Sequence, residues 1–300
     1  MKNILRIAVL IFIGSTAFGQ SGNKVITSAK VKNVRAFDGT ETTTNLIRKP
    51  NPFVQARNAK SNVETVVGET TYDLQTNSTC QNRIVNHGDG TISLSWTYSN
   101  SFDLQASDRG TGYNYYDGSS WGSYPTARQE ANTRTGWNSL SRTDQGNEIV
   151  VNHPAEPGGA LRIMTRTTIG SGTWSESQVS TSLNNDLLWP RSVTAGSNGQ
   201  TVHVIGITAP VANDGTVHNG MDGALLYWRS QDGGSTWDIK DLQVPGSDSA
   251  FFLDVDADAY AIDARGNTVA FVMFNQFADV VLFKSTDNGD NWTRTIVNDF

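Results

Sequence analysis

The residues best suited to binding a ligand are aspartate, arginine, histidine and tryptophan side chains in the longer polar segments of the chain. Arginine and carboxylate groups form strong charge-assisted hydrogen bonds, and an indole ring offers a flat apolar surface. Such a set suits a polar polymer, either a glycan or a peptide. The candidate ligand-binding residues are Asp108, Arg109, Trp189, Arg191, His218 and Asp222. Alternatively, Trp137 and Trp189 are packing residues between repeats, because large aromatic rings dominate core burial.

Three further carboxylates, Asp254, Asp256 and Asp258, alternate along one short segment. On a β-strand, alternate residues point to the same face, where their mutual repulsion favours a bound cation. Calcium prefers oxygen ligands of this kind, but Ala259 stands at the sixth position, where a calcium-binding EF-hand loop has glycine. The segment therefore predicts either a calcium site or a solvated acidic edge. No other cofactor is expected.

The sequence gives no residue a catalytic role. Its four histidines lack the HExxH spacing of zinc enzymes. Gly118–Gly122 matches G-x-S-x-G, but a nucleophile elbow needs a strand-to-helix turn, and this segment lies in an all-β repeat. Cys80 is the single cysteine, so it forms no internal disulfide and is either a small buried residue or an intermolecular partner. We therefore expect binding without turnover.

The elements that position the candidate residues are β-hairpins that recur four times. Each consists of a short strand, a tight turn and a second strand rich in β-branched residues. Turns built from Asn, Asp and Gly supply the positive φ angles that two-residue hairpins require. The turn glycines are Gly90, Gly146, Gly199 and Gly266.

A third strand follows each hairpin and ends in a turn closed by tryptophan. These residues are Trp121, Trp174, Trp237 and Trp292, separated by 53, 63 and 55 residues. A period near 50 residues with four strands per unit predicts an all-β fold, a β-propeller of four-stranded antiparallel blades. We expect blades at about 81–136, 137–188, 189–250 and 251–300. Since closed propellers have roughly four to eight blades, these four either form a four-bladed ring or belong to a larger one, and we expect a ring of six to eight.

Two of the tryptophan turns share the pattern S-x-D-x-G-x-[TN]-W. This pattern resembles the Asp-box (BNR) repeat of sialidase-like β-propellers. Its aspartate can accept backbone N–H groups within its own turn, which indicates a structural role. The turns that end at Trp121 and Trp174 carry Tyr116 and Ile169 at the aspartate position. The Asp-box residues are Ser230, Asp232, Gly234 and Trp237, and Ser285, Asp287, Gly289 and Trp292.

Sialidases with such propellers share an Arg-Ile-Pro motif and three arginines that hold the substrate carboxylate. In this chain Val85 follows Arg83 and Ile84, and Met164 follows Arg162 and Ile163, so the motif is broken twice. The resemblance implies a secreted propeller, and intact structural turns beside a broken catalytic motif predict that it binds an extracellular glycan or protein. A sialidase-like glycoside hydrolase or a lyase is the alternative, and a passive spacer in an adhesin is a third possibility.

The blade connections predict where a ligand binds. In a four-stranded blade, the Asp-box turns lie at the same end as the glycine turns of the hairpins. The other end is formed by the loops between second and third strands, at 100–112 and 210–223, and by the links between blades. Binding residues accumulate on loops held by a rigid scaffold, so we expect the site at this end.

Residues 1–19 have the features of a secretory signal peptide, with Lys2 and Arg6 before the apolar run Ile7–Ile13. We expect cleavage after Gly19, secretion, a leader with one or two strands over 20–80, and no transmembrane segment in the mature protein. The net charge of -6 and the lack of a basic cluster exclude nucleic acid as a partner. The order of features resembles exported Bacteroidetes propeller proteins, on the segments Tyr72–Gln75, Asp108–Tyr113, Leu188–Arg191 and Asp222–Tyr227. Such chains usually continue into a C-terminal sorting domain.

Overall fold

The computed structural model describes residues 64–72, 75, 82–103, 106–155, 159–184, 186–275 and 278–299. The chain divides into two compact units, 1–63 and 64–300, and the described residues belong to the second. The predicted signal peptide, most of the leader and Cys80 lie outside the described residues. Within these residues, no helix has the length and apolar character needed to cross a membrane.

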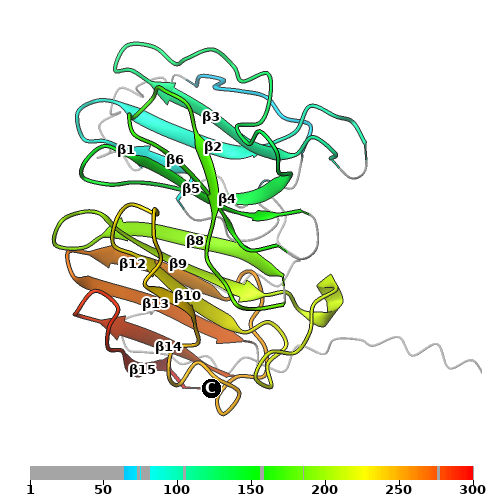
Figure 1. The fold of residues 1–300 in the computed structure, drawn as a ribbon, viewed down its shortest axis with the longest axis vertical. Coiled ribbons are helices and arrows are strands. Elements are labelled where there is room, and N and C mark those ends of the chain that lie inside the picture. Colours follow the sequence, from blue (N-terminus) through cyan, green and yellow to red (C-terminus); the bar gives the residue numbers. More distant parts are fainter. Residues whose placement is uncertain are drawn as a thin grey trace, which may run out of the picture. The chain divides into compact units, whose positions relative to one another are not determined.

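The described strands form four antiparallel sheets, and each strand pairs with its neighbour in sequence (Figure 1). This order of strands is that of propeller blades, which confirms the predicted fold class. Blade 1 contains β1 (Ile84–Asn86), β2 (Ile92–Tyr98) and β3 (Gly110–Tyr116); blade 2 contains β4 (Thr135–Arg142), β5 (Glu148–Pro154), β6 (Arg162–Arg166) and β7 (Ser175–Gln178); blade 3 contains β8 (Leu187–Ala195), β9 (Thr201–Thr208), β10 (Leu225–Ser230) and β11 (Ile239–Leu242); blade 4 contains β12 (Tyr260–Arg265), β13 (Thr268–Asn275), β14 (Ala278–Ser285) and β15 (Thr293–Asn298).

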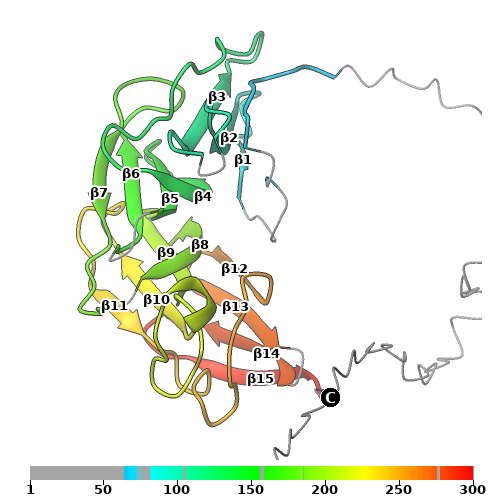
Figure 2. The ribbon, with the colours of Figure 1, turned by 90° about the vertical axis from the view of Figure 1, so that its right-hand side faces the viewer.

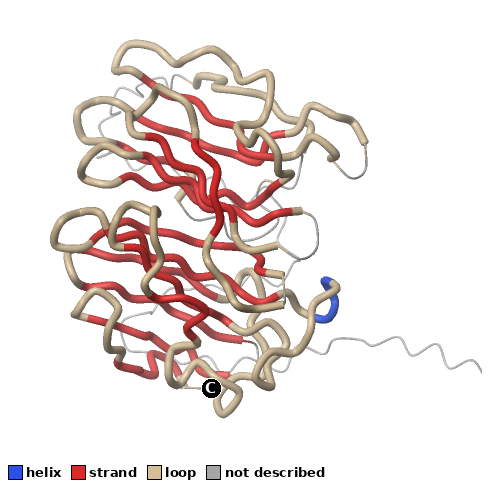
Figure 3. Tube along the Cα trace, viewed as in Figure 1, coloured by secondary structure: helices blue, strands red, loops and turns tan. Residues whose placement is uncertain are grey.

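Blade 1 differs from the predicted four-stranded pattern, because its sheet has three strands among the described residues. After β3 the chain makes only an isolated bridge between Tyr116 and Trp121. Among the described residues, the remaining connections are loops and turns, apart from one short 3-10 helix, η2 (Val211–Asn213), after β9 (Figure 3). The views in Figures 1 and 2 show the blades following one another in chain order.

The apolar core lies between blades, because each sheet has two faces to bury. Between blades 3 and 4, Ile205 and Tyr227 pack in one cluster with Phe271 and Phe283, whose rings stack at 4.8 Å. A second cluster joins blades 2 and 3 through residues such as Ile163 and the fully buried Trp228. Stacking of neighbouring blades thus buries apolar side chains that a single sheet would leave exposed to solvent.

The junction of blades 1 and 2 contains a buried ion pair. Glu148, at the start of β5, lies 2.5 Å from Arg166 at the end of β6. From blade 1, the Tyr113 hydroxyl donates to Glu148 at 2.8 Å, and Ser93 also bonds to this carboxylate. The Arg166 guanidinium lies between the rings of Tyr113 and Trp174, at 4.2 and 4.4 Å from their centroids. Burial raises the pKa of Tyr113, so this phenol stays protonated as a hydrogen-bond donor.

The Asp-box turns are closed by their own side chains. Asp287 accepts from the Ser285 hydroxyl at 2.7 Å, the Asn291 backbone at 2.9 Å and the Asn291 amide at 2.8 Å. The Asn291 side chain is the main cause that lowers the pKa of Asp287 to about 2. Asp232 makes the same contacts with Ser230 and Thr236 in blade 3. The geometry matches the structural role expected for these aspartates.

In blade 1 a different residue fills the aspartate position. Asp117, one residue after Tyr116, accepts the backbone N–H groups of Ser119 and Ser120, both at 2.8 Å. The Ser120 backbone is the main cause that lowers the pKa of Asp117 to about 2. A carboxylate therefore still holds the turn in blade 1, but it comes from the residue after the position that the Asp-box pattern predicts.

The tryptophan turns of blades 2 and 4 also contact the preceding blade. Gly289 adopts φ +96°, and a Cβ at this position would overlap the hydroxyl of Tyr227 in blade 3. Trp292 contacts the same Tyr227 at 5.1 Å and Phe271 of its own blade at 5.2 Å. Gly170 in blade 2 packs in the same way on Tyr115 of blade 1. The turn tryptophan of blade 4 thus lies between two blades.

Candidate functional site

Two cavities at the end of the blades opposite the Asp-box turns share two wall residues, Trp189 and Asn213. The first cavity, of about 470 Å³, lies between blades 3 and 4. The second cavity, of about 350 Å³, lies between blades 2 and 3 and reaches Arg109 of blade 1. The first cavity is lined by residues that include Trp189, Asn213, Asp222, Asp254, Asp256, Asp258, Phe274 and Asn275, and the second by residues that include Arg109, Trp137, His153, Asp186, Trp189, Asn213 and Asp214.

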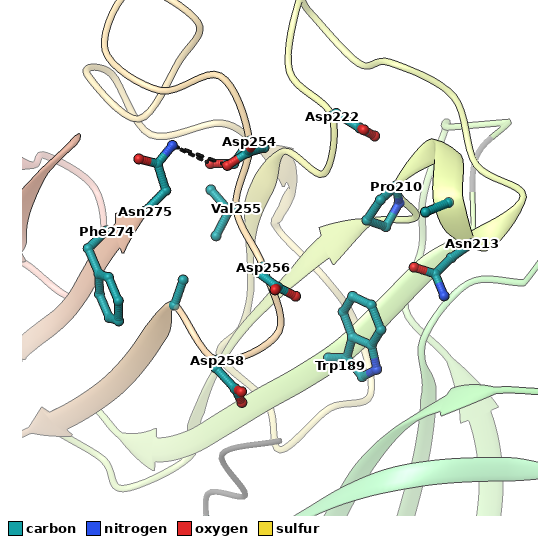
Figure 4. A pocket seen from close by; sticks show the side chains of 12 residues that line it. Trp189, Pro210, Asn213, Asp222, Asp254, Val255, Asp256, Asp258, Phe274 and Asn275 are labelled. Atoms are coloured by element: carbon teal, nitrogen blue, oxygen red, sulfur yellow. Dashed lines mark hydrogen bonds between the residues drawn. The ribbon is translucent and has the colours of Figure 1, made fainter. Parts of the chain in front are cut away.

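The first cavity is built from connections that two blades hold in place. Trp189 comes from β8, Asp222 from the loop before β10, and Asp254–Asp258 from the link before β12 (Figure 4). Asn275, at the end of β13, donates its amide to Asp254 at 3.1 Å. Asp222 accepts the backbone N–H of Val211 at 2.8 Å, which fixes η2 beside the opening. The lining thus combines aromatic rings with carboxylate and amide groups.

Trp137 and Trp189 occupy equivalent, unusual positions in β4 and β8. Their φ angles are +51° and +46°, and the register of each strand with its hairpin partner shifts around them. Left-handed backbone is rare for bulky residues and costs on the order of 1–3 kcal/mol. Both indoles are only partly buried. These bulges turn a tryptophan toward the cavities at the same point of two successive blades.

His153 connects the two tryptophans. Its Nδ1 accepts the backbone N–H of Trp189 at 2.9 Å, and its ring lies 5.3 Å from that of Trp137 at an angle of 35°. Burial, with a smaller contribution from Arg109, lowers the pKa of His153 to about 3. The imidazole is therefore neutral at ordinary pH. Since Nδ1 accepts a hydrogen bond, the ring proton is on Nε2.

Arg109 is positioned at the start of β3. Its Nε donates to the Thr135 carbonyl at 2.9 Å, and its guanidinium lies 5.4 Å from the ring centroid of Tyr72. Tyr72 in turn makes an edge contact with Trp137 at 6.3 Å. Arg109 and Trp137, which line the second cavity, thus both contact the ring of Tyr72.

Of the six candidate ligand-binding residues, three line the cavities: Trp189 and Asp222 in the first, and Arg109 in the second. Asp108 accepts the Ser99 hydroxyl at 2.5 Å and the N–H groups of Asn100 and Ser101, so it closes its own loop.

Arg191 and His218 line neither of these cavities. Arg191 is buried behind the first cavity, where it donates to the Ala257 carbonyl at 2.6 Å and lies 4.0 Å from the ring centroid of Tyr260. His218 forms a bridge with Met221 in the loop before β10. The structure thus brings together half of the residues that the sequence singled out.

The three alternating carboxylates line the first cavity, but not as a strand. Asp254 forms one parallel bridge with Asp222, and the Asp256 carbonyl accepts the N–H of Ala259 in a turn. The expected strand over these residues is wrong, although their alternating exposure holds. Among the described residues, no three His, Cys, Asp or Glu side chains come close enough to hold a metal ion. The calcium prediction gains no support from this geometry.

The arginines of the broken sialidase motif are engaged elsewhere. Arg83 donates to the side-chain oxygen of Gln75 at 2.8 Å and to its carbonyl at 3.2 Å. Arg162 donates to the side chain of Gln178 at 2.9 Å. Neither lines the two cavities that meet at Trp189. No triple-arginine cluster is formed by the lining residues of these cavities.

The polar and aromatic residues of the cavities that the sequence did not single out include His153, Asp186, Asn213, Phe274 and Asn275. His153 lies within a continuous buried strand, which gave it the pattern of a core residue. Phe274 and Asn275 end a predicted hairpin strand, and only their place beside the link before β12 makes them part of the site.

The sequence matches no protein-family model and no curated protein. Among solved structures, a protein of unknown function from Dyadobacter fermentans is 12% identical, covering 73% of this chain and 71% of that chain with a TM-score of 0.45. The BP39L lectin from Burkholderia pseudomallei is 12% identical, covering 73% and 54%, with a TM-score of 0.48. The six-bladed fucose-recognising lectin of Aleuria aurantia is 12% identical, covering 69% and 57%, with a TM-score of 0.43.

The chain spans a little over half the length of these two lectins. Because all three TM-scores lie below 0.5, the fold assignment rests on the strand order and blade packing of the chain itself.

Proposed function

We propose that this protein is an exported Asp-box β-propeller that binds an extracellular glycan, without turnover, in the two cavities that meet at Trp189. The observation that carries the proposal is the pair of left-handed tryptophans, Trp137 and Trp189, which project beside carboxylate and amide groups. Backbone strain of this kind persists only where surrounding structure holds it, and it concentrates at binding and catalytic sites.

The chemistry of the lining suits a sugar. A pyranose ring has apolar C–H faces, which pack on aromatic rings, and a rim of hydroxyls, which bond to fixed polar groups. Trp189 and Phe274 supply the aromatic surface, and Asn213, Asp222 and Asp256 supply polar groups around it. A concave site of a few hundred Å³ with aromatic walls and few, well-placed polar groups is the usual form of a small-ligand site.

Binding without turnover agrees with the state of the titratable groups. His153 is a weak base because its pKa is about 3, and its Nδ1 already accepts a hydrogen bond. Asp232 and Asp287 are committed to their own turns. Neither kind of group is placed to act as a general acid or base near pH 7.

The proposal is tested by screening the full chain against a glycan panel and measuring Kd for the best ligand. Trp189→Asn keeps a residue that tolerates positive φ and removes the indole, so we expect at least a tenfold loss of affinity. The matched control is Trp121→Asn, which removes a partly buried indole at the other end of the blades. Equal affinity of Trp189→Asn and the unchanged protein would overturn the assignment of the site.

The same panel distinguishes the enzymatic alternative. Release of reducing ends would reveal a glycoside hydrolase, and unsaturated sugar products would reveal a lyase. Either product, abolished in Trp189→Asn, would replace binding by turnover. Export is tested separately, by comparing the extracellular fraction of the full chain with that of a chain lacking residues 2–19, which should stay inside the cell.

A further inference from the structure

A third cavity, of about 490 Å³, lies on blade 1. Three segments form it: residues 69–71 before β1, residues 98–102 at the end of β2 and in the loop that follows, and residues 124–126 after β3. The third cavity shares no lining residue with the two cavities that meet at Trp189. The proposed glycan-binding function therefore makes no use of it.

Hydrogen bonds hold the walls of the third cavity in place. Thr71 donates its backbone N–H to the Ser99 carbonyl at 2.8 Å and its hydroxyl to the Ser101 carbonyl at 2.7 Å. On the other side, Tyr124 donates its hydroxyl to the Val66 carbonyl at 3.1 Å. These bonds join residues that are far apart in the chain, so the walls are preformed.

Three aromatic rings line the third cavity. Tyr98 is buried, with 4% of its surface exposed, whereas Tyr124 is 45% exposed and Phe102 is 96% exposed. Pro125 adds an apolar ring next to Tyr124 in the chain. Among the described residues of the lining, Glu69 alone carries a charge. Such a surface suits an uncharged ligand that has apolar rings of its own.

The Tyr98 hydroxyl is a donor that lacks a partner. It forms no hydrogen bond with any residue that the structure describes, although a buried tyrosine hydroxyl usually finds a partner. Burial, with a smaller contribution from Asp108, raises the pKa of Tyr98, so the phenol stays protonated. Because the ring is enclosed by protein and lines the cavity, an acceptor for this hydroxyl has to enter from the cavity.

The remaining hydrogen-bonding capacity of the lining distinguishes a peptide from a sugar. Thr70, Thr71 and Ser99 already donate their hydroxyls, to two backbone carbonyls and to Asp108. A sugar ring carries hydroxyls around its whole rim and needs several fixed partners, whereas proline offers a carbonyl and no N–H. Proline-rich segments form the polyproline II helix and dock on aromatic-lined grooves. One phenol donor among aromatic rings therefore fits a proline-rich peptide better than a sugar.

We propose that the third cavity is a second binding site of this protein, which takes an extended, proline-rich segment of a partner protein. Phe102 and Tyr124 pack on proline rings of this segment, and Tyr98 donates to one of its backbone carbonyls. The site shares no residue with the proposed glycan site, so a glycan and a peptide can bind together.

The test measures the affinity of the full chain for decaproline, with a decamer of alternating glycine and serine as the control peptide. We expect decaproline to bind about tenfold more tightly, because its helix is preformed. Tyr98→Phe removes only a hydroxyl that bonds to no described residue. It should weaken decaproline binding about fivefold and leave the free energy of unfolding unchanged.

Two further variants locate the site. Phe102→Ala should weaken decaproline binding about tenfold, because it removes an apolar ring that the peptide buries. The matched control for Tyr98→Phe is Tyr116→Phe, at the other end of blade 1 and outside the cavity, and it should leave the affinity unchanged.

Three results would overturn the assignment. Equal affinity of Tyr98→Phe and the unchanged protein for decaproline would show that this phenol is not the donor. Loss of decaproline binding in Trp189→Asn would place the peptide in the glycan site. Decaproline that binds no more tightly than the control peptide, with a glycan bound at two sites of which Phe102→Ala removes one, would make the third cavity a glycan site. Glycan binding that depends on Trp189 stands or falls separately from all three.

Discussion

Aspartates at the two ends of the blades differ in the number of hydrogen bonds that their carboxylates accept. At the end of the blades that carries the Asp-box turns, here called the turn end, Asp287 accepts three hydrogen bonds from two residues of its own turn. Asp117 likewise accepts hydrogen bonds from residues of its own turn. At the opposite end, here called the loop end, Asp254 accepts from the Asn275 amide and Asp256 from the N–H of Ala257, and both aspartates line a cavity. The first arrangement uses the carboxylate to fix backbone, and the second leaves charge and acceptor capacity facing solvent.

The difference extends to backbone geometry. In the Asp-box turn of blade 4, positive φ falls on Gly289 and on Asn288, residue types that tolerate it, whereas at the other end of the blades it includes the bulky residues Trp137 and Trp189. The strain of a bulky left-handed residue thus lies at the end where a ligand is expected to bind. The following predictions test whether the two ends differ in this way.

The largest expected effect is at the buried pair of the turn end. Glu148→Gln leaves Arg166 buried without its carboxylate partner, and breaking such a pair costs about 3–5 kcal/mol of unfolding free energy. Denaturant unfolding measures this loss. Replacing both partners, as Glu148→Leu with Arg166→Met, should recover most of it. A loss of unfolding free energy below about 1 kcal/mol for Glu148→Gln would show that the buried ion pair contributes less to stability than we infer.

Gly289→Ala should cost about 2–4 kcal/mol, because strain at φ +96° adds to overlap with the Tyr227 hydroxyl. The control is Gly266→Ala, which also has positive φ but would place its Cβ in open space, and it should cost about 1 kcal/mol. Thermal and denaturant unfolding compare the two. Equal losses would mean that the contact between turn and preceding blade adds nothing to stability.

Acidification should destabilise the protein through one buried histidine at each end. Burial lowers the pKa of His153 to about 3 and that of His203 to about 4, so below pH 6.5 the unfolded chain binds protons that the folded chain does not. The free energy of unfolding therefore falls as the pH drops through 6.5 toward 4, by about 2 kcal/mol per histidine at pH 5. Unfolding curves at pH 7.5 and pH 5 measure it.

His153→Asn and His203→Asn should each remove about half of this pH dependence. If His153→Asn leaves the dependence intact, the loop end admits water and His153 titrates as an exposed residue. That result would also weaken its assigned role in holding Trp137 and Trp189.

The smallest effects come from single aspartates. Asp287→Ala removes the closure of its turn and should cost about 1–2 kcal/mol. Asp256→Ala at the loop end should change the free energy of unfolding by less than about 0.5 kcal/mol, the usual range for exposed sites. Calorimetry of the two variants side by side gives the comparison directly. A reversed order would contradict the division of roles between the ends.

The fold followed from the sequence because its signals are local. Glycine turns such as that at Gly199 and the two Asp-box patterns recur at one spacing, and each describes a contact within a few residues. The site did not follow in the same way. Trp189, His153 and Phe274 come from three blades, and their proximity depends on how blades pack and on bulges in β8 and β4. No spacing along the chain records such contacts.

Some residues were misjudged for the same reason. Arg191 lies two residues after Trp189, yet the bulge in β8 separates the cavity-lining indole from a buried guanidinium. Asp254–Asp258 alternate as a strand would, but the chain follows a bridge and a turn. Local patterns predicted which residue types lie at the loop end, and only the packing of blades selected among them.

Pairing of each strand with its neighbour in sequence has a consequence for how this protein can change over time. The loop from β9 to β10 joins two adjacent strands, so lengthening it alters no other pairing. Doubling a flexible loop costs only about 0.6 kcal/mol in closure entropy. Insertions around Asp222 can therefore reshape the cavity within the stability that the turn end supplies, and related chains can acquire new ligands while the blades remain the same.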